Sequence, residues 1–138
     1  MVEPEQERIV IDTSALVAVV TGEATRPWLI ERTRAAELLA PASVPWEVGN
    51  AFSAMLRRRR ADLRELRVAL LAFRAIPLRL IEVDLGLALT LCAEHGLYAY
   101  DAYLLACAQA QRCRLLTLDG GLATAARRAG VRIVEIEA

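Results

Sequence analysis

The sequence contains no lysine, and its 17 basic side chains are all arginine. This absence excludes the P-loop phosphate clamp and Schiff-base catalysis, since both need a lysine amine. It also counts against an aspartate-based phosphatase, which the strand-end Asp12 followed by Thr13 would otherwise suggest, because such enzymes place a lysine beside the aspartate.

Histidine and cysteine are scarce as well. His95 is the only histidine, which excludes a histidine-rich zinc site and the histidine pair of a metal-independent ribonuclease. The three cysteines match neither a disulfide framework nor a zinc motif, which indicates packing in a reducing cytoplasm. Chemistry therefore has to come mainly from carboxylates and hydroxyls.

Long apolar runs and a basic leader are also missing. No run approaches the roughly 18 residues of a membrane span, and the start "MVEPEQERIV" is acidic where a signal peptide would be basic. We expect a cytoplasmic protein without a membrane segment. The net charge is zero, so nucleic-acid binding would require a local basic patch rather than a global field.

Apolar patterning predicts an α/β protein of one domain. Strands are predicted at residues 8–11, 36–43, 78–85 and 131–138 and within 113–121. Helices are predicted at residues 14–20, 26–34, 45–60, 62–76, 86–94, 101–111 and 122–129. Such alternation favours a parallel sheet covered on both faces, with ligands beyond the carboxyl ends of its strands.

Four acids stand next to apolar runs, unlike the other acids of the chain. They are Asp12 in "IVIDTSAL", Glu47 in "VPWEVGNAF", Asp101 in "YAYDAYLLACA" and Asp119 in "LLTLDGGL". Each has a structural alternative: Asp12 and Asp101 as helix N-caps, Glu47 as a first-turn acid, and Asp119 as a turn residue before two glycines. Ser43 precedes Glu47 by four residues where a capping box needs three.

The combination indicates a metal site more strongly than any single acid. All four are predicted at strand ends or helix starts, so they should converge on one edge of the sheet. Close carboxylates repel and raise one another's pKa, and a hard cation relieves that repulsion. Mg²⁺ prefers such oxygen ligands, and Mn²⁺ can replace it.

The sequence resembles the PIN-domain family, particularly bacterial VapC ribonuclease toxins, in four segments that occur in this order: "IDTSAL", "PWEVGNAF", "YDAYLLACA" and "LLTLDGG". The likeness spans nearly the whole chain. It implies one PIN-like nuclease domain over residues 1–138, with a three-layer fold and a parallel sheet of about five strands flanked by helices. It further implies a Mg²⁺-dependent endoribonuclease, a homodimer and a VapB-like antitoxin.

The resemblance also implies roles for individual residues. Asp12, Glu47, Asp101 and Asp119 match the acidic cluster, and the three aspartates would hold the metal. Ser14, Thr117 and Asn50 match supporting positions beside those acids. Many relatives carry a further acid soon after the fourth, where this chain has Gly120 and Gly121, which leaves open whether one or two ions bind.

Cleavage would use metal-activated water in an in-line displacement that leaves 5′-phosphate and 3′-hydroxyl ends. The dense basic run Arg57, Arg58, Arg59 and Arg60 either complements a helix C-terminus or contacts RNA or an antitoxin. Single-stranded or looped RNA is the expected substrate. Trp46 and Tyr100 flank two of the acids, and we interpret them as core residues rather than base-stacking platforms.

An alternative function is a catalytically silent PIN-like interaction module, in which the acids only cap helices. Metal binding separates the two hypotheses, because a divalent cation should stabilise the enzyme and leave the silent module unchanged.

Overall fold

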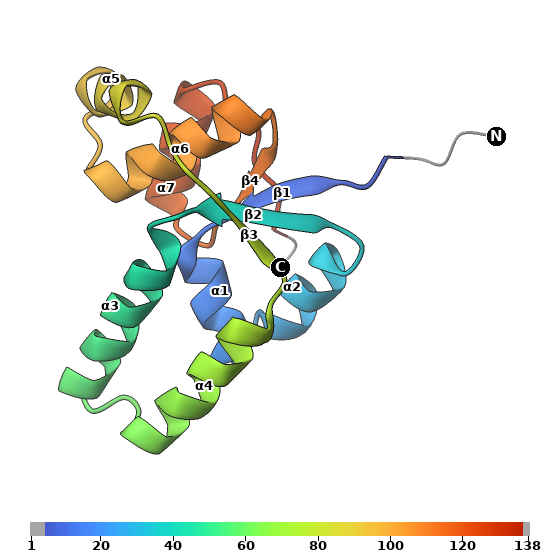
Figure 1. Cartoon of the computed structure of the whole chain (residues 1–138), viewed down its shortest axis with the longest axis vertical. Coiled ribbons are helices and arrows are strands. Elements are labelled where there is room, and N and C mark those ends of the chain that lie inside the picture. Colours follow the sequence, from blue (N-terminus) through green and yellow to red (C-terminus); the bar gives the residue numbers. More distant parts are fainter. Residues whose placement is uncertain (1–4, 137–138) are drawn as a thin grey trace.

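A computed structural model describes residues 5–136, which contain a four-stranded parallel sheet covered by helices (Figure 1). The strand order is β3-β2-β1-β4. The strands are β1 (Arg8–Ile11), β2 (Glu37–Pro41), β3 (Leu78–Ile81) and β4 (Arg114–Leu116). The helices are α1 (Thr13–Val20), α2 (Arg26–Thr33), α3 (Val44–Arg57), α4 (Leu63–Ala75), α5 (Leu85–His95), α6 (Ala99–Gln111) and α7 (Gly120–Arg128).

Two apolar cores lie on opposite faces of the sheet because successive strand side chains point to opposite sides. In β1, Val10 joins the core formed with α5, α6 and α7, whereas Ile9 and Ile11 join the core formed with α1, α2, α3 and α4. The two groups of helices lie on either side of the sheet in Figure 1. Burial on both faces explains why the strands are apolar runs rather than alternating ones.

The register of the central strands places polar residues side by side at the carboxyl end of the sheet. Ile11 pairs with Leu116, and both are followed directly by polar residues, Asp12 and Thr117. The backbone N–H of Asp12 donates to the carbonyl of Leu116 at 3.1 Å, which extends the pairing by one residue. As predicted, Asp12 and the residues just before Asp119 lie at this edge of the sheet.

The predicted parallel sheet between helices is confirmed, but the predicted number of strands was wrong. The described residues form four strands rather than about five, because the expected last strand is reduced to a single bridge between Leu115 and Ile133. Leu115 makes backbone hydrogen bonds to Arg132 and Val134, both at 2.9 Å. The buried side chains of Val131 and Val134 hold this segment against the two cores without a continued ladder. Residues 137 and 138 of the expected strand lie outside the described range.

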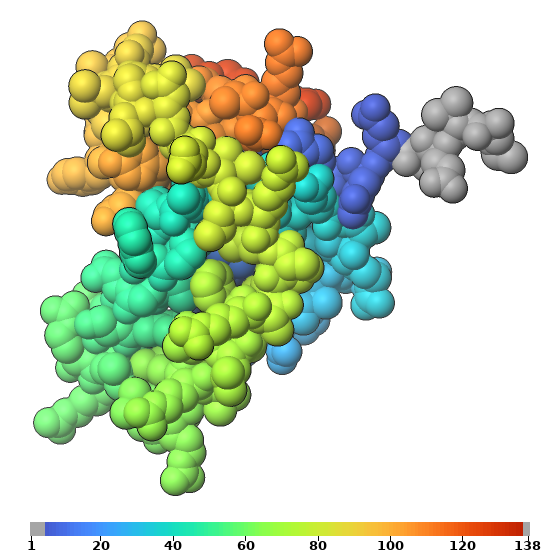
Figure 2. Space-filling model, viewed as in Figure 1, coloured from blue at the N-terminus to red at the C-terminus, as the bar shows by residue number. Residues whose placement is uncertain are grey.

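Helices α3 and α4 form the predicted hairpin, which projects from the sheet as a lobe (Figure 2). Asp62 begins α4 as predicted, and a capping box fixes the turn: Glu65 N–H donates to Asp62 Oδ1 at 2.8 Å, and Asp62 N–H donates to Glu65 Oε1 at 3.2 Å. Phe52 and Leu66 bury the inner face of the hairpin. None of the helices in residues 5–136 combines the length and hydropathy that a membrane span requires.

The buried core predicts the cost of truncating Leu115, which is fully buried on β4. Leu115→Ala should lower the free energy of unfolding by about 2–5 kcal/mol, because it removes apolar burial and leaves a cavity. Leu89→Ala on the exposed side of α5 is the control and should change it by less than about 0.5 kcal/mol. Urea unfolding followed by circular dichroism measures both; equal losses would contradict the described core.

Candidate functional site

Asp12 is the buried carboxylate at the centre of the site. It follows β1, caps α1, and its residue is only 3% exposed. Its Oδ1 accepts hydrogen bonds from the Ser14 hydroxyl at 2.7 Å and from Ala15 N–H at 3.1 Å, and its Oδ2 accepts one from the Thr117 hydroxyl at 2.5 Å. The predicted cap and the predicted site position therefore coincide in one residue.

The hydroxyls of Thr117 and Ser14 tie the β1–α1 junction to the β4–α7 junction. Thr117 Oγ1 donates to Asp12 and accepts from Asp119 N–H at 3.0 Å. Ser14 Oγ donates to Asp12 and accepts from Leu118 N–H at 3.0 Å. Both hydroxyls predicted to support the acids lie beside them and orient Asp12.

Asp119 and Asp101 lie near the starts of two helices, α7 and α6, on the other face of the sheet. Asp119 caps α7, and its Oδ1 accepts from Gly121 and Leu122 N–H groups at 2.9 and 3.2 Å. Asp101 does not cap α6, so the N-cap interpretation was wrong: Tyr98 occupies that position and Asp101 lies in the first turn. Asp101 therefore has no local backbone role of the kind that explains Asp119.

Glu47 lies in the first turn of α3, as predicted, and is held by Ser43. The Ser43 hydroxyl donates to Glu47 Oε2 at 3.0 Å. The sequence reasoning missed Ser43 because it tested the three-residue spacing of a capping box, whereas a spacing of four lets two side chains meet on one helix face. Ser43 opposes the effect of burial on the pKa of Glu47, and Thr13 Oγ1 is buried without a hydrogen-bond partner in the described part of the chain.

Burial and the charges of neighbouring acids both affect three of these carboxyl groups. Burial is the main cause that raises the pKa of Asp12, Glu47 and Asp101. Charge repulsion adds to each: Asp119 raises the pKa of Asp12 and of Asp101, and both Asp12 and Asp101 raise the pKa of Glu47. Hydrogen bonds from Thr117 and Ser14 oppose the increase at Asp12.

The carboxylates do not form a closed ligand shell. Across residues 5–136, no group of three or more His, Cys, Asp or Glu side chains is arranged to hold a metal ion directly. The trio predicted to bind metal, Asp12, Asp101 and Asp119, is thus gathered at one end of the sheet but not drawn tightly together. Metal binding by these residues stays a prediction.

The other predicted residues lie along α3 and beyond it. Asn50 is exposed, one turn after Glu47. The four arginines occupy the exposed end of α3 and the turn before α4, where Arg59 adopts a positive φ of 55°. A rise of 1.5 Å per residue places Arg58 about 16 Å along the helix from Glu47. The arginine run is therefore not part of the carboxylate site.

Aromatic side chains beside the acids are more exposed than the sequence suggested. Trp46 is 78% exposed and Tyr100 is 52% exposed, so the interpretation of both as core residues was wrong. Tyr98, which sequence reasoning did not single out, is also exposed. Tyr100 packs edge-on against Tyr103, with ring centroids 5.8 Å apart. An aromatic residue in the first turn of a helix can be exposed even when an apolar run follows it, so the sequence alone does not predict its burial.

Fold and site together define an α/β protein with an acidic site at the carboxyl end of a parallel sheet. The chain belongs to the PIN domain family, whose sequence model matches residues 9–128. This match confirms the resemblance found in the four acidic segments. No curated protein sequence matches the chain significantly.

Several solved structures share this fold. PAE2754 from Pyrobaculum aerophilum is 25% identical with a TM-score of 0.68, over 86% of each chain. The Mycobacterium tuberculosis toxin VapC20, which cleaves the sarcin-ricin loop, is 19% identical with a TM-score of 0.63, over 93% of this chain and 99% of that one. A toxin-antitoxin complex from Klebsiella pneumoniae contains a chain 21% identical with a TM-score of 0.58, over 80% and 86% respectively.

Electrostatic coupling predicts the effect of Asp101→Asn. Removing this charge should lower the pKa of Glu47, because Asp101 raises it, and carbon-13 NMR titration of the carboxyl groups measures the change. A carboxyl whose pKa is raised on folding contributes stability below its unfolded pKa and loses it as pH rises through the folded value. The stability of the variant relative to wild type should therefore increase from about pH 3.5 to about pH 7.

Urea unfolding at the two pH values measures that second effect. Glu23→Gln, an exposed acid between α1 and α2, is the control and should show no comparable pH dependence. An unchanged Glu47 pKa in Asp101→Asn would show that the two carboxylates do not share one space.

Proposed function

We propose that this protein is a Mg²⁺-dependent endoribonuclease that acts as the toxin of a type II, VapBC-like toxin-antitoxin pair. The observation that carries the proposal is the gathering of Asp12, Glu47, Asp101 and Asp119 at one end of the sheet, where burial and neighbouring carboxylates raise the pKa values of the first three. PIN domains are generally nucleases. The similarity to VapC20 and to the toxin-antitoxin complex supports the toxin assignment.

The donor chemistry of the site fits Mg²⁺, or Mn²⁺ in its place. Carboxylates are the oxygen ligands these ions prefer, and mutual repulsion among the acids would be relieved by a cation. Among residues 5–136 no three of these side chains are arranged to hold an ion directly, so some of them would contact it through water. Mg²⁺ commonly keeps several waters and binds through one or two carboxylates, so an open acidic site suits it.

Asp12, Asp101 and Asp119 would hold the ion, and when bound it would lower the pKa of a coordinated water and offset charge on the phosphate oxygens. Ser14 and Thr117 fix the carboxylate of Asp12 by hydrogen bonds, so this ligand is pre-oriented before substrate arrives. Glu47, on α3, would orient the attacking water. Its raised pKa makes it a stronger proton acceptor than an ordinary glutamate.

In-line attack by that water on the phosphodiester would leave 5′-phosphate and 3′-hydroxyl ends. The proposed substrate is single-stranded or looped RNA, whose bases are available for contact. We also propose that the chain forms one nuclease domain, works in the cytoplasm, assembles as a homodimer and pairs with a VapB-like antitoxin. The similarity to a chain of a toxin-antitoxin complex supports the proposal of an antitoxin partner.

Substitution of the acids tests the nuclease proposal. Asp12→Ala or Asp101→Asn should reduce Mg²⁺-dependent cleavage of single-stranded RNA by more than about 100-fold, since loss of even an outer partner of a metal ligand costs 10–100-fold. Chelation of divalent ions should abolish cleavage by the wild type. Product ends identified by ligation and phosphatase treatment should be 5′-phosphate and 3′-hydroxyl. Glu94→Gln, an exposed acid on α5, is the activity control.

Thermal melting in the same proteins separates the enzyme from a silent PIN-like module. Mg²⁺ or Mn²⁺ should raise the melting temperature of the wild type and of Glu94→Gln, but not of Asp101→Asn. Cleavage that survives both site substitutions would refute the assigned site. Absence of both cleavage and metal stabilisation in the wild type would favour the silent module.

The arginine run provides a separate prediction about RNA or antitoxin contact. Changing Arg57 and Arg58 to Gln should make the logarithm of RNA affinity fall less steeply with the logarithm of salt concentration, because fewer counterions are released. Two exposed arginines elsewhere, Arg128 and Arg132, changed to Gln serve as the matched control. Fluorescence anisotropy across a salt series measures the slopes, and equal slopes in both double variants would assign the run to helix termination alone.

A further inference from the structure

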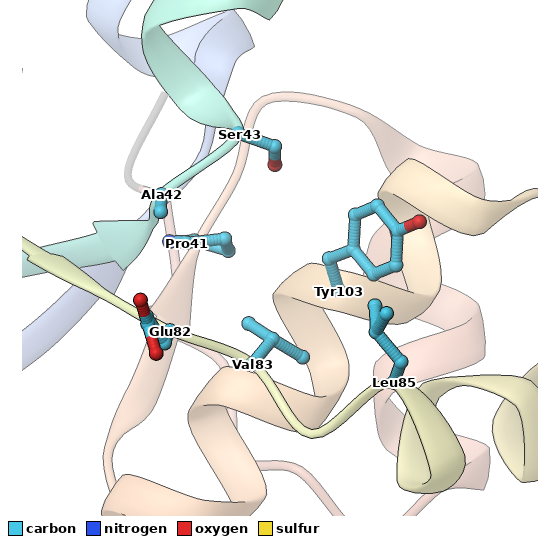
Figure 3. Close-up of a pocket in the computed structure, with 7 residues that line it drawn as sticks. All are labelled: Pro41, Ala42, Ser43, Glu82, Val83, Leu85 and Tyr103. Atoms are coloured by element: carbon cyan, nitrogen blue, oxygen red, sulfur yellow. The ribbon is translucent and has the colours of Figure 1, made fainter.

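A cavity of about 280 Å³ opens beside the carboxylate site, between the end of β2, the segment after β3 and helix α6. Figure 3 shows the side chains of Ser43, Val83 and Tyr103 around its open space. Its walls are mostly apolar, and Ser43 and Glu82 are the polar residues beside the ring of Tyr103. The lining residues are Pro41, Ala42, Ser43, Glu82, Val83, Leu85 and Tyr103.

The cavity and the carboxylates are built from the same elements. Ser43 lines the cavity and donates its hydroxyl hydrogen to Glu47 Oε2 at 3.0 Å. Tyr103 lines the opposite wall and lies on α6, the helix whose first turn carries Asp101. The exposed Tyr100 packs edge-on against Tyr103 at an interplanar angle of 79°, which restrains that wall. A group in the cavity would therefore lie next to a phosphate held at the acids.

We propose that this cavity binds one unstacked nucleobase of the RNA strand whose phosphate is cleaved at the carboxylates. The inference rests on the proposed ribonuclease function and adds to it a base-recognition site. Its volume lies just below the usual range for pockets of drug-sized ligands, which suits one ring system rather than a peptide helix. The apolar lining and the ring of Tyr103 suit the face of a base, since aromatic side chains stack on every base.

Charge decides which part of a nucleotide enters. Glu82 at the rim is an acceptor that disfavours a phosphate and favours the amino groups of adenine, cytosine or guanine. Uracil has no exocyclic amino group to donate to this carboxylate. The base is therefore the part that enters the cavity, while the phosphate stays at the acids, where a cation can offset its charge. A base that carries an amino group is preferred over uracil.

Abasic substitution tests the inference independently of cleavage. Asp101→Asn, which is expected not to cleave, is mixed with a fluorescent single-stranded RNA and with copies that lack one base at each position in turn. One position should weaken binding by about 5-fold or more when its base is missing, because stacking of one base on an aromatic side chain contributes roughly 1–3 kcal/mol. Fluorescence anisotropy measures each dissociation constant.

A variant that fills the cavity should abolish this difference. Val83→Phe in the same background should bind the intact RNA only as well as the abasic copy, while Val68→Phe on the exposed side of α4 should retain the difference. Ala42→Leu is a second filling variant in case Val83→Phe melts at a lower temperature. Glu82→Gln should reduce the preference for an amino-bearing base over uracil at that position.

The outcomes separate this inference from the proposed function. If the wild type cleaves RNA and no single abasic position matters, or the filling variants keep the difference, the base site is wrong and the ribonuclease proposal stands. If the filling variants weaken self-association instead of RNA binding, the occupant is a side chain of a second copy and the inference is overturned. If the wild type neither binds nor cleaves RNA, both proposals fail.

Discussion

The hydrogen bond from Thr117 to Asp12 is the interaction on which the arrangement of the site depends. It crosses between two strand ends that are more than one hundred residues apart in the sequence, and it provides a donor for a carboxylate that burial would otherwise destabilise. Thr117 also accepts from the backbone of Asp119, so one hydroxyl sets the positions of two acids. Register of β1 with β4 brings these residues together before any side chain is placed.

Helix starts make a cluster of like charges tolerable. Asp12 and Asp119 are N-caps, and Glu47 and Asp101 lie in first turns, so each carboxylate stands at the positive end of a helix dipole. A role in helix stability and a role in the proposed site are therefore compatible for these acids. An acid that caps a helix contributes to stability, and the same placement aims it at the carboxyl end of the sheet, where parallel α/β proteins bind ligands.

The order of strands and helices was predictable because apolar runs and turn residues are strong local features, and the four acids were identifiable by their apolar flanks. Details that depend on tertiary context were not. The last strand shrank to one bridge at Ile133 because β4 offers only a short partner. Tyr98, rather than Asp101, is the N-cap of α6, and Trp46 is exposed to solvent. Local sequence preferences do not determine either feature. The contact of Ser43 with Glu47 required the helix geometry itself.

Placement of the arginine run at the far end of α3 has a consequence for a molecule whose formal net charge is zero. Negative charge gathers where α3 begins, and positive charge gathers where it ends. Such a molecule has a permanent charge polarity, and a polyanion that approaches it exerts a torque rather than a uniform attraction or repulsion. A first encounter would bring the arginine end of α3 to the polyanion. The polyanion would then have to follow the outer surface of α3 to reach the acids.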